Sequence, residues 1–183
     1  MRNLKFKKIT DSQVEISELM LPSRSNFNGK IHGGYILSLL DQIAFACASK
    51  HSGVYCVTAS VDTVDFLAPI EIGELVTMKA SVNYVGKSSM VIGIRVEAEH
   101  IQNGMVKHCN SSYFTMVAKD ENGKSVAVPG LILENDHDVR RFVKSMKRLK
   151  MKIKRKKEFN ETDFSSEEYM HLMDDHNVKI EIN

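Results

Sequence analysis

The chain has 183 residues, of which 43% are hydrophobic and 26% are charged, enough apolar material for a globular core. No uncharged apolar run reaches the roughly 18 residues of a membrane-spanning helix, and the basic first ten residues lack the apolar region of a signal peptide. The formal net charge of +2 is unevenly spread, because residues 140–157 hold eleven Lys and Arg and no acid. These features predict one domain with a basic appendage.

The first predicted elements are a strand and a buried helix. Residues 12–20 alternate between apolar and polar side chains, which favours a strand. After a polar loop to Lys30, Gly33–Lys50 carries apolar side chains around most of a helical surface, so we expect a helix buried on most sides. Four runs rich in Val, Ile, Thr and Tyr then predict long strands separated by turns. These runs are Tyr55–Phe66, Glu74–Val85, Ser88–Ile101 and Lys107–Ala118.

One long helix followed by long antiparallel strands predicts the α+β class. We place one domain over residues 1–135 and a basic helical extension with an acidic tail over residues 136–183. Asp136 or Asp138 is expected to cap the helix of the extension, and Ser165–Glu168 resembles a capping box for another short helix. The basic helix has an apolar seam formed by Phe142, Met146, Leu149 and Ile153.

A single acid interrupts the apolar helix. Asp41 is the only charged residue between His32 and Lys50, and burying an unpaired carboxylate costs several kcal/mol. Either the helix faces solvent at this one position, or a nearby donor holds Asp41, or the carboxylate has a chemical role.

A glycine pair at the start of this helix favours the chemical role. Gly33 and Gly34 leave the backbone open to another molecule, and the first helical amides could polarise a carbonyl. Asp41 lies seven residues after Gly34, on nearly the same face but about 10 Å along the helix. A second, antiparallel copy would bring Gly34 of one chain towards Asp41 of the other, which predicts a dimer with two shared sites.

The loop before the glycine pair offers further polar candidates. Asn26 and Asn28 could serve the turn itself, or one of them could orient a water or hold a carbonyl. His32 could act as a base, or it could fix the loop. The residue types leave these alternatives open.

The chain resembles the hot-dog-fold acyl-CoA thioester hydrolases, including the small bacterial enzymes and the mammalian brain-type hydrolase. The resemblance rests first on Asn26-Phe-Asn-Gly29-Lys-Ile-His32-Gly33-Gly34 followed by Leu-Leu-Asp41, and it covers roughly residues 12–150. Further matching segments are Val57–Asp62, Phe66–Pro69, Gly73-Glu74, Gly86–Met90 and Val128–Glu134.

The resemblance implies a long central helix wrapped by a curved antiparallel sheet, in dimers that assemble further into trimers of dimers. It also implies a site at the dimer interface, built from Asn26 of one chain and Asp41 of the other. The thioester carbonyl would meet the Gly34 amide, and Asp41 would act as a general base or as a nucleophile that forms an anhydride. CoA would run across the dimer near residues that bind it, namely His32, Gly33, Gly86, Lys87, Ser88 and Ser89.

Two other functions remain open. A non-catalytic acyl-CoA-binding regulator would use the same fold, although no helix-turn-helix signal precedes the domain. A hot-dog dehydratase or hydratase would need a catalytic His, for which His32 is the candidate. The basic stretch 140–157 could pack on the domain, meet CoA phosphates, or contact an anionic membrane or nucleic acid.

The expected partners are an acyl-CoA substrate and further copies of the chain, with no nucleic acid. We expect no cofactor, since CoA belongs to the substrate and product, and no metal. The three cysteines, Cys47, Cys56 and Cys109, have no close pairing, which favours reduced thiols in the cytoplasm. The implied role is acyl-CoA turnover in fatty acid metabolism.

Overall fold

The computed structural model describes residues 5–164, 176–179 and 181. They belong to two compact units, one ending at Ser145 and the other beginning at Met146. The predicted capping box at Ser165–Glu168 lies outside the described residues, and the predicted domain boundary after residue 135 stays a prediction.

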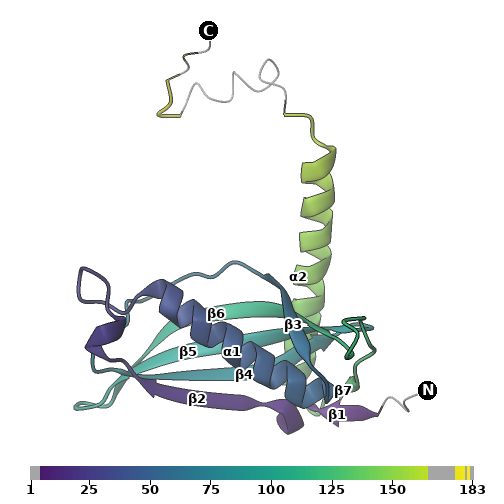
Figure 1. Ribbon diagram of the computed structural model, residues 1–183, viewed down its shortest axis with the longest axis horizontal. Helices are drawn as coiled ribbons and strands as arrows, with labels where there is room; N and C mark the ends of the chain where they lie inside the picture. Colours follow the sequence, from purple (N-terminus) through teal and green to yellow (C-terminus); the bar gives the residue numbers. More distant parts are fainter. Residues whose placement is uncertain (1–4, 165–175, 180, 182–183) are drawn as a thin grey trace. The chain divides into compact units, whose positions relative to one another are not determined.

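The first unit is built on a five-stranded antiparallel sheet with one long helix across it (Figure 1). The strand order is β2-β4-β5-β6-β3, so the three longest strands occupy the centre. This architecture confirms the predicted α+β class. The strands are β2 Val14–Leu19, β3 Cys56–Val61, β4 Leu75–Val85, β5 Ser89–His100 and β6 Met105–Ala118.

The core lies between α1, Gly33–Ser52, and one face of this sheet. We call that face the inner face and the opposite one the outer face. Alternate residues of β4 and β5 point inward, as the period of two requires, and they include Val82 and Ile92, both with no exposed surface. The buried side of α1 consists of Ile36, Leu39, Leu40, Ile43, Ala44, Cys47, Ala48 and His51.

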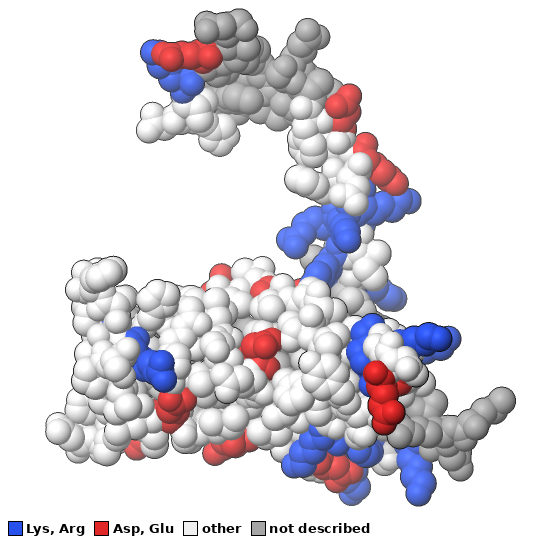
Figure 2. All heavy atoms as spheres, viewed as in Figure 1, with Lys and Arg blue, Asp and Glu red and all other residues white. Residues whose placement is uncertain are grey.

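The other side of α1 is uncovered within one chain, which corrects the expectation of a helix buried on most sides. Leu37 and Phe45 are more than a third exposed, and Asp41 is also exposed. Apolar side chains around a helix predict burial on most sides, but in one chain the sheet covers only one side of α1. The surface over α1 is largely uncharged, whereas Lys and Arg gather along α2 (Figure 2).

Strand β3 is shorter than the predicted run Tyr55–Phe66, because regular pairing with β6 ends at Val61. A register shift between Thr58 and Ser60 interrupts the ladder. The chain nevertheless stays beside β6, since Phe66 bridges Asn110. The residue types indicated a strand over the whole run, but the structure divides it into the regular strand β3 and an isolated bridge at Phe66.

A small parallel sheet of β1, Phe6–Lys8, and β7, Gly130–Ile132, was not predicted. Buried His51 connects it to the end of α1: its Nε2 lies 3.1 Å from the Pro129 carbonyl oxygen, and its Nδ1 lies 3.3 Å from the Ser12 hydroxyl. Short strands of three residues carry too little periodicity to be found in the sequence.

Helix α2 spans Asp136–Glu161, and its first ten residues belong to the first unit. The capping prediction was wrong by one residue, because Asn135 Oδ1 accepts the amide of Asp138 at 3.0 Å. Asp138 Oδ2 in turn accepts the Glu134 amide at 3.2 Å and the side-chain amide of Asn135 at 3.1 Å, so Asp138 also helps to fix the start of the helix. The ring of Phe142 packs on Tyr84, with centroids 5.1 Å apart.

Candidate active site

The loop that carries Asn26 is closed by its own hydrogen bonds. The Asn26 amide donates to the Lys30 carbonyl at 2.7 Å, and Asn26 Oδ1 accepts the amides of Asn28 at 2.9 Å and Lys30 at 3.2 Å. Among the described residues, Asn26 Nδ2 has no acceptor. The turn chemistry and the binding role weighed for Asn26 are therefore compatible, because the oxygen shapes the loop while the nitrogen can donate to a ligand.

His32 caps the helix that follows. The Gly34 amide donates to His32 Nδ1 at 3.0 Å, and the amides of Tyr35 and Ile36 donate to the His32 carbonyl. His32 therefore fixes the start of α1. The Gly34 amide, predicted to meet a thioester carbonyl, already has an acceptor in this chain, and a carbonyl would have to share or replace it.

Asp41 lies on the uncovered side of α1 and is held by strand β3. Its Oδ1 accepts a hydrogen bond from Thr58 Oγ1 at 2.5 Å. Thr58 comes directly before the register shift of β3, and such bulges re-aim side chains. Two of the alternatives for Asp41 are thus both correct: the carboxylate faces solvent within one chain, and a nearby donor orients it.

A cavity of about 480 Å³ opens beside Asp41, between α1 and β3. Its walls are about equally polar and apolar, and Phe45 and Tyr55 form a ring pair with centroids 5.6 Å apart among the lining residues. A cavity that combines apolar surface with an oriented carboxylate is compatible with a small-molecule site. The lining residues are Asp41, Gln42, Phe45, Tyr55, Cys56, Val57, Thr58 and Met116.

The turn between β4 and β5 holds four other predicted site residues. The Gly86 amide donates to the Ser89 carbonyl at 2.7 Å. The carbonyls of Lys87 and Ser88 accept the amides of Val128 and Ala118. The Lys87 side chain is exposed. This turn is therefore anchored by its backbone and leaves the ammonium group of Lys87 in solvent.

The predicted residues form separate groups within one chain. The eight positions between Gly33 and Asp41 correspond to a rise of about 12 Å along α1, and Asn26 lies beyond Gly33 in the preceding loop. Thr58 was missed as a site residue, because a Thr in a strand is ordinary and only the tertiary structure brings it to Asp41.

Two sequence expectations concern membranes and metals. Within residues 5–164, 176–179 and 181, no helix is long and apolar enough to cross a membrane. The same residues contain no group of three His, Cys, Asp or Glu side chains placed to hold a metal ion. The three cysteines are free and buried, and burial raises the pKa of Cys47 to about 12.

Sequence comparisons identify relatives of this chain. Residues 28–104 match the model of the thioesterase superfamily. Protein VdlD of Helicobacter pylori is 42% identical over 143 residues, which are 78% of this chain and 82% of that protein. A Bacillus subtilis protein described as an uncharacterized acyl-CoA thioester hydrolase is 36% identical over 129 residues, 70% of this chain and 75% of that protein.

Solved structures agree with the sequence relatives. A hexameric acyl-CoA thioesterase superimposes with a TM-score of 0.80 and 31% identity, covering 82% of this chain and 97% of that one. The acyl-CoA hydrolase of Staphylococcus aureus, solved with butyryl-CoA and CoA, gives a TM-score of 0.79 and 31% identity over 91% of this chain and 99% of its own.

These matches confirm the hot-dog fold and the resemblance to the acyl-CoA thioester hydrolases. Several of these relatives are described as acyl-CoA thioester hydrolases or acyl-CoA thioesterases. The chain therefore belongs to the acyl-CoA thioester hydrolases of the thioesterase superfamily.

Proposed function

We propose that this enzyme hydrolyses acyl-CoA to a free acid and CoA at a site shared by two chains, where Asp41 activates water. The single observation that carries the proposal is the carboxylate of Asp41, exposed beside a cavity between α1 and β3 and oriented by Thr58. Asn26 of the second chain positions the water or the thioester, and the cavity beside Asp41 receives the acyl or pantetheine portion of the substrate.

In this reaction Asp41 takes a proton from water as the water oxygen attacks the thioester carbonyl carbon. The C–S bond then breaks, and the departing sulfur receives that proton, so that acid and thiol are released. Direct attack by Asp41, which would form an acyl anhydride for water to cleave, is the alternative route. Either route needs a donor for the carbonyl oxygen, and the Gly34 amide can supply it once it exchanges His32 Nδ1 for the substrate.

Two features support a dimer that completes the site. Strand β3 is an edge of the sheet, and an uncovered edge is a template for pairing with a second copy. The uncovered side of α1 and the segments beside it expose a set of large apolar side chains, which a second chain would cover. This set contains Leu37, Phe45, Tyr55, Val61, Phe66 and Leu67.

Assembly and substrate binding extend the same proposal. The hexamer described for a structural relative favours a trimer of such dimers. The CoA portion lies near His32 and Gly33 of one chain and the turn Gly86–Ser89, with Lys87 meeting phosphate. The reaction needs no cofactor, and we propose a cytoplasmic role in fatty acid metabolism. A dehydratase would need His32 as its catalytic base, but Nδ1 of that ring caps α1.

The decisive variant is Asp41→Asn, which keeps the size of the side chain and a hydrogen bond to Thr58 but removes the base. We expect release of free thiol from acyl-CoA to fall by at least about 10³-fold, while CoA binding measured by calorimetry changes little. Near wild-type turnover in this variant would contradict the assignment. The same thiol-release assay over a panel of acyl-CoA lengths identifies the preferred substrate.

Shared sites are tested by mixing two inactive chains. Asn26→Ala and Asp41→Ala chains with different affinity tags are refolded together, and heterodimers are isolated through both tags. A heterodimer has one intact site of its two, so about half of the wild-type activity should return. Purified heterodimers without activity would show that Asn26 and Asp41 act within one chain.

A further inference from the structure

The outer face of the sheet carries a second cavity, also of about 480 Å³. It opens between the strands and the first turns of α2, and all its lining residues belong to the first unit. We call it the outer-face pocket. The sheet separates it from α1 and therefore from Asp41 of the same chain, so it is not part of the site described above.

Two cross-strand rows form the floor of this pocket. In the first row Ser81 of β4, Gly93 of β5 and Tyr113 of β6 lie side by side. In the second, the neighbours are Lys79, Arg95 and Ser111. Since Gly93 has no side chain, the middle of the floor is open.

The amide group of Asn83 occupies the space over Gly93. A Cβ on Gly93 would lie 2.1 Å from Asn83 Nδ2, and Asn83 falls at the register shift of β4. Asn83 is only 5% exposed, and its Oδ1 accepts the Ser81 hydroxyl at 3.0 Å. Among the described residues, Asn83 Nδ2 has no acceptor, so a buried polar group lines the pocket with a donor to spare.

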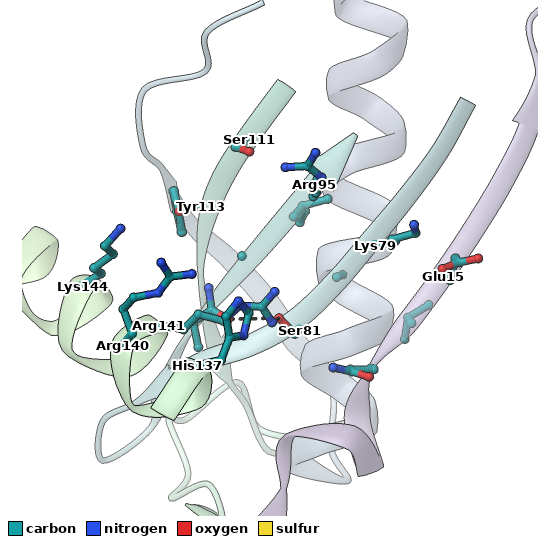
Figure 3. Close-up of a pocket in the computed structure, with 16 residues that line it drawn as sticks. Glu15, Lys79, Ser81, Arg95, Ser111, Tyr113, His137, Arg140, Arg141 and Lys144 are labelled. Atoms are coloured by element: carbon teal, nitrogen blue, oxygen red, sulfur yellow. Dashed lines mark hydrogen bonds between the residues drawn. The ribbon is translucent and has the colours of Figure 1, made fainter. Parts of the chain in front are cut away.

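Helix α2 supplies a cationic wall. His137, Arg140, Arg141 and Lys144 follow the spacing i, i+3, i+4, i+7, which places them on one side of the helix, and Figure 3 shows them beside the strands that carry Ser81, Arg95 and Tyr113. Nη1 of Arg141 lies 3.4 Å from the Ser81 hydroxyl.

The charges around the pocket are not balanced. Five Lys and Arg side chains line it against a single acid, Glu15. Lys79 and Arg95 share one further carboxylate, Glu97, at 3.0 Å and 2.7 Å. Within the described part of the chain, Arg140 and Lys144 have no acidic partner. Cations held together without counter-charge repel one another, and a bound anion would remove that cost.

We propose that the outer-face pocket binds a phosphate-bearing anion at a site separate from the catalytic one. Guanidinium groups pair with phosphate through two parallel hydrogen bonds, and ammonium groups meet it as point charges. The Asn83 amide and the Ser111 hydroxyl add uncharged donors on the floor. Lys79 and Arg95 already share Glu97, so Arg140, Arg141 and Lys144 are the cations that a multiply charged phosphate would meet in the pocket. We expect the ligand to be a free polyphosphate. The phosphates of CoA are the other possible source, and the second test below distinguishes the two.

The first test is binding of inorganic tripolyphosphate to the full-length protein, measured by calorimetry at low ionic strength. The pocket variant is Arg140→Gln/Lys144→Gln, in which both side chains are exposed and therefore dispensable for folding. The control is Lys147→Gln/Lys150→Gln, which makes the same charge change on the same helix outside the pocket. We expect affinity to fall by at least about tenfold in the pocket variant, and by no more than about twofold in the control. Equal losses in the two variants, or no binding to the wild type, would overturn the proposal.

The second test identifies the source of the phosphates. A free-anion site predicts that CoA does not displace tripolyphosphate and that the pocket variant keeps the wild-type KM for acyl-CoA. Displacement by CoA together with a raised KM in the pocket variant alone would show that the pocket belongs to the substrate site, and the proposal of a separate site would be wrong. The calorimetric readout does not depend on hydrolysis, so it stands even where the catalytic role of Asp41 fails.

Discussion

The inner and outer faces of the same sheet have opposite chemistry. Along β5, Ile92, Ile94 and Val96 enter the core beneath α1, while Gly93 and Arg95 line the outer-face pocket. The inner face gains its stability from apolar burial, and that packing fixes the helix that carries Asp41. The outer face instead keeps glycine, amide and cationic groups under α2. One alternating pattern thus produces a packed support for the helix α1 on one side of the sheet and an open, charged floor on the other.

The largest expected difference between the faces is in stability. Ile92→Ala removes side-chain volume from the inner face, where Ile92 has no exposed surface, and should lower the free energy of unfolding by about 3 kcal/mol. The outer-face control, Arg95→Ala, removes a half-exposed side chain paired with Glu97 and should cost less than about 1 kcal/mol. Urea denaturation at a fixed protein concentration measures both free energies of unfolding. Similar losses in the two variants would mean that the outer face contributes as much to stability as the inner face.

Gly93→Ala tests the close approach on the outer face. The added Cβ would collide with Asn83 Nδ2, so the Asn83 side chain must move and its bond with Ser81 is lost. We expect a loss of about 2 kcal/mol in the free energy of unfolding. In the double variant Asn83→Ala/Gly93→Ala the collision is gone, and the cost should be clearly below the sum of the two single costs. Additive costs would show that Asn83 does not lie over Gly93.

Thr58→Val tests how strand β3 orients Asp41, the acid that we propose to be catalytic. The variant removes the hydrogen bond to Asp41 Oδ1 with little change in shape, so kcat should fall by about tenfold while KM stays nearly constant. Thr58→Ser keeps the hydroxyl and is the matched control. If both variants lost activity equally, packing of the Thr58 methyl group and not its hydrogen bond would be responsible.

The smallest effect concerns His51 at the end of α1. Burial lowers the pKa of His51 in the folded chain. In the unfolded chain the pKa of a His is about 6.5, so the unfolded chain binds a proton more readily than the folded chain. The stability that neutral His51 provides is fully present above about pH 6.5 and declines as the pH falls below it, by at most about 1.4 kcal/mol per pH unit. The difference in unfolding free energy between wild type and His51→Gln should therefore shrink between about pH 7.5 and about pH 5. A constant difference would contradict this.

Much of the chain was predicted because its signals are local. The helix from Gly33, the three long strands and the α+β class follow from periodicity and from turn residues, and each appears within a few residues of its expected bounds. Asn135 as the helix cap and the early end of β3 at Val61 were not predicted. Both depend on which donors and strands lie nearby in the folded chain. The residues adjacent in the sequence carry no information about these tertiary neighbours.

The candidate site divides in the same way. Asp41 was identified as a candidate from the sequence alone, because a charged residue within an apolar helix is costly to bury and is therefore conspicuous in the sequence. The hydrogen bond from Thr58, the cavity beside it and the capping of Gly34 by His32 were decided only by the tertiary structure. The outer-face pocket was also decided by the tertiary structure, since Arg140 and Lys144 line one cavity with Gly93 and Asn83 only when the start of α2 packs beside the sheet. Sequence periodicity determines which face of an element a residue occupies, whereas contacts between distant elements determine what that residue can do.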